Sequence, residues 1–223
     1  MQDHSSGIVH IIDDDAGMRN SLFMLVTSAA LAARVYASAE EFLHDAGGQV
    51  AGCIVLDLRM PGMSGMDLLQ RLRADGNPLP VVVISGHADV PTTVRGMKLG
   101  AVDVLTKPVE PATMIEAIRN ALRLSTQLQD QQQQSQTIRQ RFTSLTSREL
   151  ELLRCVVAGL SSKQIASQLG ISIKTVANHR ANLMAKTGAL NAADLARLST
   201  LAGIATASAG PVIEPNPPEQ QAM

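Results

Sequence analysis

The stretch Cys53-Ile54-Val55-Leu56-Asp57-Leu58-Arg59-Met60-Pro61-Gly62 decides the fold of this chain. An apolar run leads directly into an aspartate, and a Pro-Gly pair ends the stretch a few residues later. A short continuous apolar run of this kind is typical of a strand that is buried on both faces of a parallel sheet. Asp57 then lies at the carboxyl end of the strand, where open α/β sheets bind their ligands. A carboxylate at the end of so apolar a strand suggests a nucleophile.

More apolar runs alternate with segments of helical periodicity on either side of this strand. Strands that alternate with helices predict an α/β doubly wound five-stranded parallel sheet with helices on both faces. Alternation alone is compatible with many functions. Besides the strand that ends at Asp57, we expect strands at residues 8–12, 33–36, 80–84 and 102–105, and helices at 16–30, 38–46, 63–74, 90–99 and from 111 onward.

Polar residues stand where four of the predicted strands end. Asp13 and Asp14 follow the first strand, Asp57 ends the third, Ser85 follows the fourth and Lys107 follows the fifth. Because parallel strands have their carboxyl ends at one edge of the sheet, we expect these side chains to lie together. Agreement among five positions favours a functional site over five unrelated solvent-facing residues.

The chemistry of these five residues indicates phosphoryl transfer. Three carboxylates at one point repel one another unless a cation lies among them, and oxygen ligands of this kind suit Mg²⁺ or Mn²⁺. A carboxylate can attack phosphorus and form an acyl phosphate. Lys107 would then pair with one phosphoryl oxygen, and the Ser85 hydroxyl would hydrogen-bond another.

This set of residues resembles the receiver domain of two-component response regulators, which has the CheY-like fold. The resemblance covers about residues 7–124 and rests on the motifs DDD, LDLRMPGMSG, SGH and TKP. It implies that Asp57 is the phospho-acceptor and that Ser85 and Lys107 contact the phosphoryl group. The metal ligands that it implies are the side chains of Asp14 and Asp57, Asp13 through water, and the backbone carbonyl of Arg59.

The same resemblance assigns three further positions. Arg59 and His87 occupy positions that influence how fast the phosphoryl group is lost. The family usually places an aromatic switch residue three positions before the lysine, and here that residue is Val104. A valine has little surface to relocate, so this chain departs from the aromatic-switch pattern.

Residues 125–142 form a linker that is rich in glutamine, with eight glutamines between positions 125 and 141. One interpretation is a flexible polar tether. The other is a helix that continues from the one at residue 111, because glutamine is a good helix former and the apolar residues on both sides recur at heptad spacing. We favour the helix.

Residues 143–204 are expected to form a second, small all-α domain. Residues 1–124 hold 10 basic and 14 acidic residues, whereas residues 139–204 hold 9 basic and 3 acidic ones, which favours a polyanionic partner for the second domain. Two short helical patterns joined through Leu169-Gly170-Ile171-Ser172 indicate a helix-turn-helix. The alternative is a small helical bundle without that function.

Residues 145–204 resemble the LuxR-type DNA-binding domain of the NarL/FixJ family, through the segments LTSRE, KQIA and KTVANHR, and the run HRANLMAKTG is most similar to the FixJ branch. The resemblance implies that a helix over residues 173–187 enters the major groove. Val176 and Leu183 are expected in the core, and base recognition is expected to rest on Asn178 plus apolar contact. Lys163, Lys174 and Lys186 are expected to contact phosphates of the DNA backbone. The candidate DNA contacts are Lys163, Lys174, Thr175, Asn178, His179, Arg180, Ala181 and Lys186.

Composition argues against several other classes of protein. Cys53 and Cys155 are far apart in apolar patterns, so we expect reduced, buried cysteines and neither a disulfide nor a metal site. The sequence has no signal-peptide pattern and no apolar run of about 18 residues, so we expect a cytoplasmic protein without membrane contact. Residues 1–6 and 205–223 are expected to be disordered.

The favoured interpretation is a phosphorylation-dependent DNA-binding transcriptional regulator that is not an enzyme. A sensor histidine kinase would phosphorylate Asp57, and the modified chain would form a homodimer on promoter double-stranded DNA, with RNA polymerase as a further candidate partner. One alternative is a phosphotransferase or phosphatase that works through an aspartyl-phosphate, with the basic domain as a scaffold. Another is a constitutive DNA binder, which the intact set of acidic residues and Lys107 disfavours.

Overall fold

The computed structural model describes residues 7–45, 51–86 and 90–204, and the chain divides into two compact units between Gln131 and Gln132. The ends that we expect to be disordered lie outside the described residues, as does His87. Each unit has an apolar core of its own.

Five parallel strands form the sheet of the first unit, in the order β2-β1-β3-β4-β5. All six residues of the central strand β3 are buried, which explains the continuous apolar sequence before Asp57. The predicted doubly wound five-stranded sheet is confirmed. The strands are β1 (Ile8–Ile12), β2 (Ala32–Tyr36), β3 (Gly52–Asp57), β4 (Val81–Ser85) and β5 (Asp103–Thr106), and the helices are α1 (Ala16–Ser28), α2 (Ala39–Asp45), α3 (Gly65–Ala74), α4 (Val90–Lys98) and α5 (Pro111–Thr143).

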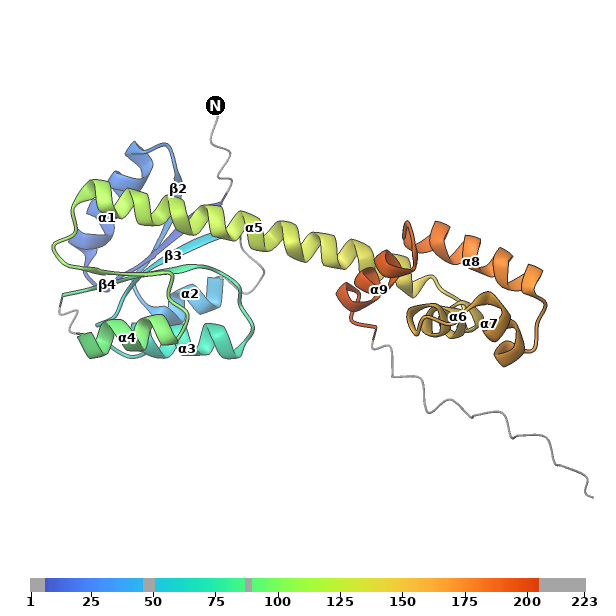
Figure 1. Cartoon of the computed structure of the whole chain (residues 1–223). Helices are drawn as coiled ribbons and strands as arrows, with labels where there is room; N and C mark the ends of the chain where they lie inside the picture. Colours follow the sequence, from blue (N-terminus) through green and yellow to red (C-terminus); the bar gives the residue numbers. More distant parts are fainter. Residues whose placement is uncertain (1–6, 46–50, 87–89, 205–223) are drawn as a thin grey trace, which may run out of the picture. The chain divides into compact units, whose positions relative to one another are not determined.

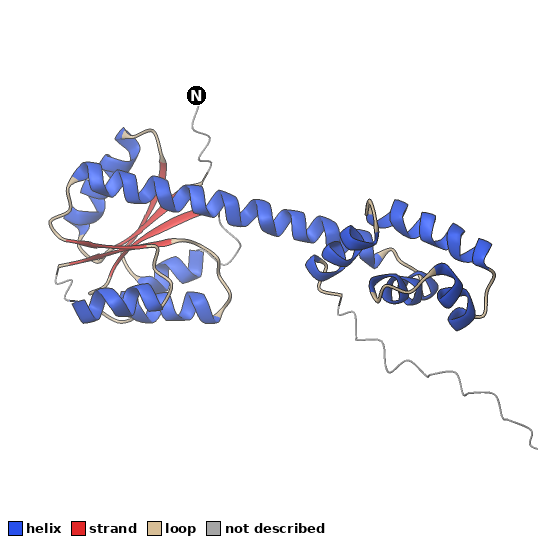
Figure 2. Cartoon of the chain, viewed as in Figure 1, coloured by secondary structure: helices blue, strands red, loops and turns tan. Residues whose placement is uncertain are grey.

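Helices cover both faces of the sheet, with α1 and α5 on one side and α2, α3 and α4 on the other (Figures 1 and 2). β3 contributes to both layers because its side chains alternate in direction. Ile54 and Leu56 belong to the core on the side of α2 and α3, whereas Cys53 and Val55 belong to the core on the side of α1 and α5. Each large aliphatic side chain buried in this way stabilises the fold by roughly 2 kcal/mol.

Some element boundaries differ from the predicted ones. α1 ends at Ser28, two residues before the predicted end, because Ala30 turns the chain with a φ of 59°. α3 begins at Gly65, two residues after the predicted start, because the Ser64 side chain accepts a hydrogen bond from the Asp67 N–H and caps the helix.

α5 is a single helix of 33 residues that includes the glutamine-rich segment. Its first turns bury Met114, Ile118 and Leu122 in the core beside β1 and β3. Its last turns contribute Ile138 and Phe142 to the core of the second unit. The core of the second unit therefore begins before residue 143, where the sequence placed the domain boundary.

The second unit consists of α6 (Ser147–Val157), α7 (Ser162–Leu169), α8 (Ile173–Thr187) and α9 (Ala192–Leu201), together with the end of α5. Thr146 and Glu149 form a capping box at the start of α6. Gly170, with a φ of 65°, ends α7 and leads into α8, which gives the predicted helix-turn-helix. No helix in the described part of the chain is long and apolar enough to cross a membrane.

Candidate functional site: a carboxylate–lysine cluster and an exposed helix

Residues from four strands meet at the carboxyl edge of the sheet. Asp57 is the last residue of β3, Asp13 follows β1, Ser85 is the last residue of β4 and Lys107 follows β5. These strands are neighbours and pair in register along this edge. The structure brings Asp13, Asp57 and Lys107 into direct contact.

The Lys107 ammonium links two buried carboxylates. Its Nζ lies 2.6 Å from Asp57 Oδ1 and 2.8 Å from Asp13 Oδ2. The backbone N–H of Arg59 donates to Asp57 Oδ2 at 2.8 Å, and the backbone N–H of Asp15 donates to Asp13 Oδ1 at 2.9 Å. Because both oxygens of each carboxylate have a partner, both carboxylates are fixed in orientation.

The backbone beside Asp57 explains the glycine-rich sequence that follows it. A Cβ on Gly65 would lie 2.1 Å from the carbonyl oxygen of Asp57, so the start of α3 can approach β3 only where the residue is glycine. The Gly65 N–H donates to the carbonyl of Leu58 at 3.1 Å. Gly65 was not among the residues predicted for the site, although its place in the segment PGMSG after the strand was an available signal.

Burial dominates the electrostatics of Asp57. It raises the pKa of the Asp57 carboxyl, and the hydrogen bond and charge of Lys107 offset this only in part. Burial alone would lower the pKa of Lys107, but the hydrogen bonds to Asp13 and Asp57 outweigh burial and leave that pKa raised. A carboxylate with raised basicity beside a fixed cation is suited to attack phosphorus.

The other residues predicted for this site surround the cluster. Ser85 is buried, and its carbonyl accepts the Lys107 N–H at 2.8 Å. Arg59 contributes its backbone N–H, while its side chain is exposed. Asp14 is also exposed.

The predicted convergence of three carboxylates is not what the structure shows. Among the described residues, no group of three or more His, Cys, Asp or Glu side chains could hold a metal ion. The reason is that the Lys107 ammonium supplies the positive charge between Asp13 and Asp57, while Asp14 lies at the surface. Carboxylate oxygens are nevertheless the ligands that Mg²⁺ and Mn²⁺ prefer, so Asp13, Asp14 and Asp57 fit such a cation in their chemistry although the three do not converge here.

Val104 lies in β5 and is half-buried at the position predicted for the switch. It packs with the core on the side of α2 and α3. A Cβ on Gly96, in α4, would lie 3.3 Å from Val104 Cγ2. The glycine and the valine therefore let α4 lie close to β5.

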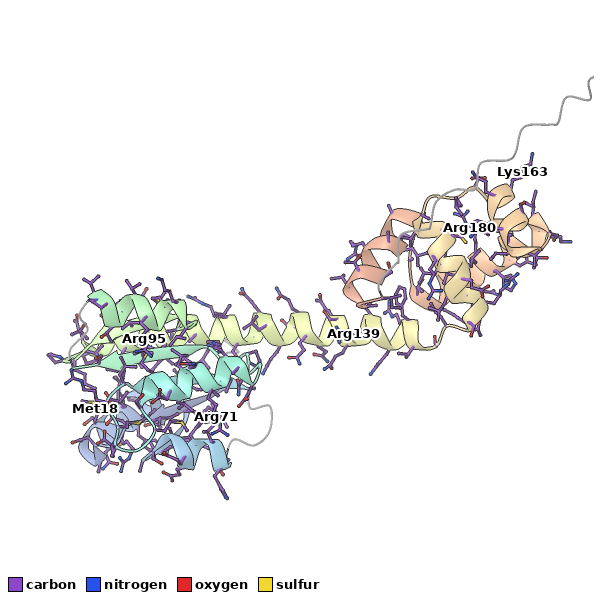
Figure 3. The ribbon with its side chains drawn as sticks, turned by 90° about the horizontal axis from the view of Figure 1, so that it is seen from below. Met18, Arg71, Arg95, Arg139, Lys163 and Arg180 are labelled. Atoms are coloured by element: carbon purple, nitrogen blue, oxygen red, sulfur yellow. The ribbon has the colours of Figure 1, made fainter. Side chains whose placement is uncertain are left out.

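The second candidate site is the exposed surface of α8. Val176 and Leu183 are fully buried, which confirms their predicted place in the core. Figure 3 labels two of the predicted contacts, Lys163 on α7 and Arg180 on α8. Of the eight predicted contacts, Lys163, Lys174, Asn178, Ala181 and Lys186 are exposed, and Thr175, His179 and Arg180 are half-buried.

Two of these predicted contacts have partners inside the domain. Lys186 Nζ lies 2.8 Å from Glu149 Oε1, and its hydrogen bond, with those from Thr146, lowers the pKa of Glu149 to about 2. Arg180 donates to Ser162 Oγ at 3.4 Å. A phosphate contact by Lys186 would compete with the ion pair. This pair could not be predicted from the sequence because its members lie 37 residues apart.

Comparison with known proteins covers both units. Residues 9–119 match the family described as response regulator receiver domain, and residues 143–199 match the family described as bacterial regulatory proteins, luxR family. The transcriptional regulatory protein FixJ of Azorhizobium caulinodans is 46% identical over 200 residues, which are 89% of this chain and 94% of FixJ. The response regulator protein TmoT of Ectopseudomonas mendocina is 39% identical over 199 residues, which are 89% of this chain and 90% of TmoT.

Two solved structures resemble the chain over most of its length. The response regulator StyR superposes with a TM-score of 0.77 at 39% identity, over 86% of this chain and 98% of StyR. Full-length FixJ from B. japonicum superposes with a TM-score of 0.55 at 40% identity, over 89% of this chain and 98% of FixJ.

Proposed function

Since the chain belongs to the response regulators that join a receiver domain to a LuxR-type DNA-binding domain, we propose that phosphorylation of Asp57 controls its binding to promoter DNA. Phosphorylation-dependent regulation of transcription is the function of this family. The contact between Lys107 and the buried Asp57, at the carboxyl edge of the sheet, is the observation that carries the assignment of the phosphorylated residue.

The phosphoryl donor is a sensor histidine kinase. An Asp57 carboxylate oxygen attacks phosphorus, and the new P–O bond forms as the P–N bond to the kinase histidine breaks. The phosphohistidine ring is protonated on its other nitrogen, so it leaves as neutral imidazole. Lys107 then pairs with a phosphoryl oxygen instead of the bare carboxylate, and the Ser85 hydroxyl binds another. The side chains of Asp14 and Asp57 and the Arg59 carbonyl, with Asp13 through water, would hold Mg²⁺ or Mn²⁺, which would supply positive charge that offsets the charge of the phosphoryl group.

Catalysis is confined to the protein's own phosphorylation and dephosphorylation, at a rate that Arg59 and His87 influence. The members of this family are transcription regulators and not classical enzymes. An aspartyl-phosphate phosphotransferase would need a second catalytic acid two residues after its nucleophile. Arg59 stands there in the sequence, which favours the regulator.

Phosphorylation promotes homodimers through the face of α4, β5 and α5. Val90, Val94 and Met97 on α4 are large apolar residues that are 76%, 44% and 48% exposed, which suits a surface that becomes covered. The dimer presents two copies of α8 to a two-fold promoter site and contacts RNA polymerase there. A protein with this role acts in the cytoplasm, where the chromosome is.

An Asp57→Asn variant tests the proposal directly. The full-length chain is treated with acetyl phosphate and Mg²⁺. Its mass is then measured by mass spectrometry, and its affinity for promoter DNA is measured in a binding assay. We expect one added phosphoryl group and tighter DNA binding for the wild type, and neither for Asp57→Asn. Asp75→Asn, which changes an exposed aspartate at the end of α3, serves as the control and should respond like the wild type. A phosphoryl group on Asp57→Asn, or DNA binding that ignores the treatment, would contradict the proposal.

A further inference from the structure

Two rows of exposed side chains run along α8, outside the face that buries Val176 and Leu183. The first row is apolar, and its members are spaced four residues apart, so they lie on one side of the helix. The second row is polar and lies beside the first. The apolar row is Ile173, Ala177, Ala181 and Ala185, and the polar row is Lys174, Asn178, Asn182 and Lys186, all of them exposed.

Ile173 is the largest member of the apolar row, and 54% of it is exposed. A β-branched residue is a poor choice for an exposed helix position, because it loses rotamer freedom there and gains no burial. A single exposed apolar residue would need no explanation. Here, however, it begins a row of four on the helix that a LuxR-type domain places in the major groove, and it lies in the first turn, which approaches the bases.

The major groove offers one apolar group, the 5-methyl group of thymine, and alanine and other apolar side chains contact it. Asparagine can form two hydrogen bonds with the N6 and N7 atoms of adenine. Guanine is usually recognised by arginine or lysine. Of the lysines and arginines on α8, Arg180 bonds Ser162 and Lys186 bonds Glu149, which leaves Lys174 for a phosphate.

We infer that α8 recognises an A·T-rich half-site, with Ile173 and the alanine row against thymine methyl groups and Asn178 and Asn182 on adenine. This inference rests on the proposed DNA-binding function and adds the base composition of the site and two residues, Ile173 and Asn182, that determine specificity. The polar and apolar rows lie side by side, so the two partners of an A·T pair can be contacted together.

The test starts from duplexes that the phosphorylated full-length chain selects out of a random-sequence pool. The selected half-sites should be rich in A·T pairs. In a selected duplex, deoxyuridine then replaces thymidine one position at a time, which removes only the 5-methyl group. At the contacted positions, we expect binding to weaken about four-fold for each methyl group, in line with the free energy of burying one.

An Ile173→Ala variant identifies the side chain that senses the methyl group. It should bind the thymine duplex more weakly than the wild type and lose the response to deoxyuridine at one position. In a second series of duplexes, 7-deazaadenine, which lacks the N7 acceptor, replaces adenine at one position at a time, and this should weaken binding of the wild type at the contacted adenines. Asn178→Ala and Asn182→Ala should each lose that weakening at one position. Leu190→Ala, which removes a side chain that is 89% exposed outside α8, serves as the control and should behave like the wild type.

The failures can be told apart. Half-sites rich in G·C pairs, or a deoxyuridine response that is the same in Ile173→Ala and the wild type, would overturn the inference while leaving DNA binding intact. If the phosphorylated chain selects no sequence at all, the proposed function fails together with the inference.

Discussion

Lys107 Nζ lies 2.6 Å from Asp57 Oδ1, and the same ammonium also bonds Asp13. Two carboxylates that are 5% and 1% exposed are therefore held together by one cation. The arrangement is costly if any of the three groups is removed, because a charge then stays buried without its partner. Under the proposed function, the negative charge of a phosphoryl group on Asp57 would meet a cation that is already in place.

Replacing Lys107 by methionine should destabilise the receiver domain in metal-free buffer by about 3 kcal/mol. The two carboxylates would face each other without a cation, which raises the free energy of the folded state. Because Mg²⁺ can supply the missing positive charge, adding it should restore more stability to the variant than it adds to the wild type. Urea unfolding followed by circular dichroism, with EDTA or with excess MgCl₂, measures both effects.

Lys98→Met is the matched control for this variant, because it removes an exposed lysine of α4. Its stability should stay within about 0.5 kcal/mol of the wild type in either buffer. Equal effects of Mg²⁺ on Lys107→Met and on the wild type would show that the ammonium and the metal do not replace one another at this site.

His10 should make the receiver domain sensitive to acid. Its Nδ1 is hydrogen-bonded to the Tyr36 hydroxyl at 3.1 Å, and that hydroxyl donates to Asp45, while among the described residues Nε2 of His10 is a buried atom without a hydrogen-bond partner. Burial, with the charge of Arg34, lowers the pKa of His10 from 6.5 to about 4. Between pH 6.5 and about 4, His10 therefore takes up a proton in the unfolded chain but not in the folded chain. The free energy of unfolding falls as the pH is lowered through this range.

A His10→Phe variant should lose this part of the pH dependence, which amounts to about 3 kcal/mol between pH 7 and 4 for one group. The ring would still pack against Tyr36 and Phe42. Urea midpoints measured across this pH range give the slope. His44→Gln removes an exposed histidine and should keep the wild-type slope. Parallel curves for His10→Phe and the wild type would mean that another group is responsible for the acid sensitivity.

Ala30→Gly should stabilise the receiver domain. Ala30 is the one described residue other than glycine with a positive φ, at 59°, and a Cβ makes that conformation costly. Glycine removes this cost but loses more conformational freedom on folding, so the expected gain is about 0.5–1 kcal/mol. Ala29→Gly is the control, because Ala29 has a φ of −84° and should only lose stability. Thermal unfolding of both variants should show a higher unfolding temperature than the wild type for Ala30→Gly and a lower one for Ala29→Gly.

The sheet and the cluster around Asp57 could be predicted because the information is local. A strand buried on both faces requires a run such as Cys53 to Leu56, and parallel strands bring their carboxyl ends to one edge whatever the rest of the sequence is. What the sequence could not show is how charge is shared at that edge. Lys107 lies 94 residues from Asp13, and only the closed sheet places its ammonium between two carboxylates while Asp14 stays at the surface.

The helices of the second unit could be predicted from the sequence, but the boundary of the domain could not. Capping residues and Gly170 mark where helices begin and end, so the helix-turn-helix follows from the sequence. The sequence also shows Ile138 and Phe142 at heptad spacing. That spacing does not indicate which domain packs against this side of the helix. In the structure these two side chains belong to the core that α6–α9 form, so the end of α5 belongs to the DNA-binding domain.

Phe142→Ala should therefore destabilise the DNA-binding domain and leave the receiver domain unchanged. Phe142 is 2% exposed in the second core, and removing so large a buried ring costs about 3–5 kcal/mol. Hydrogen exchange of the full-length chain, read separately for α6–α9 and for the sheet, measures the two domains at once. Gln140→Ala changes an exposed residue of the same helix turn and should alter neither. Faster exchange in the sheet, or unchanged exchange in α6–α9, would contradict the placement of Phe142. A chain that starts at residue 143 should show the same loss, because it lacks this ring.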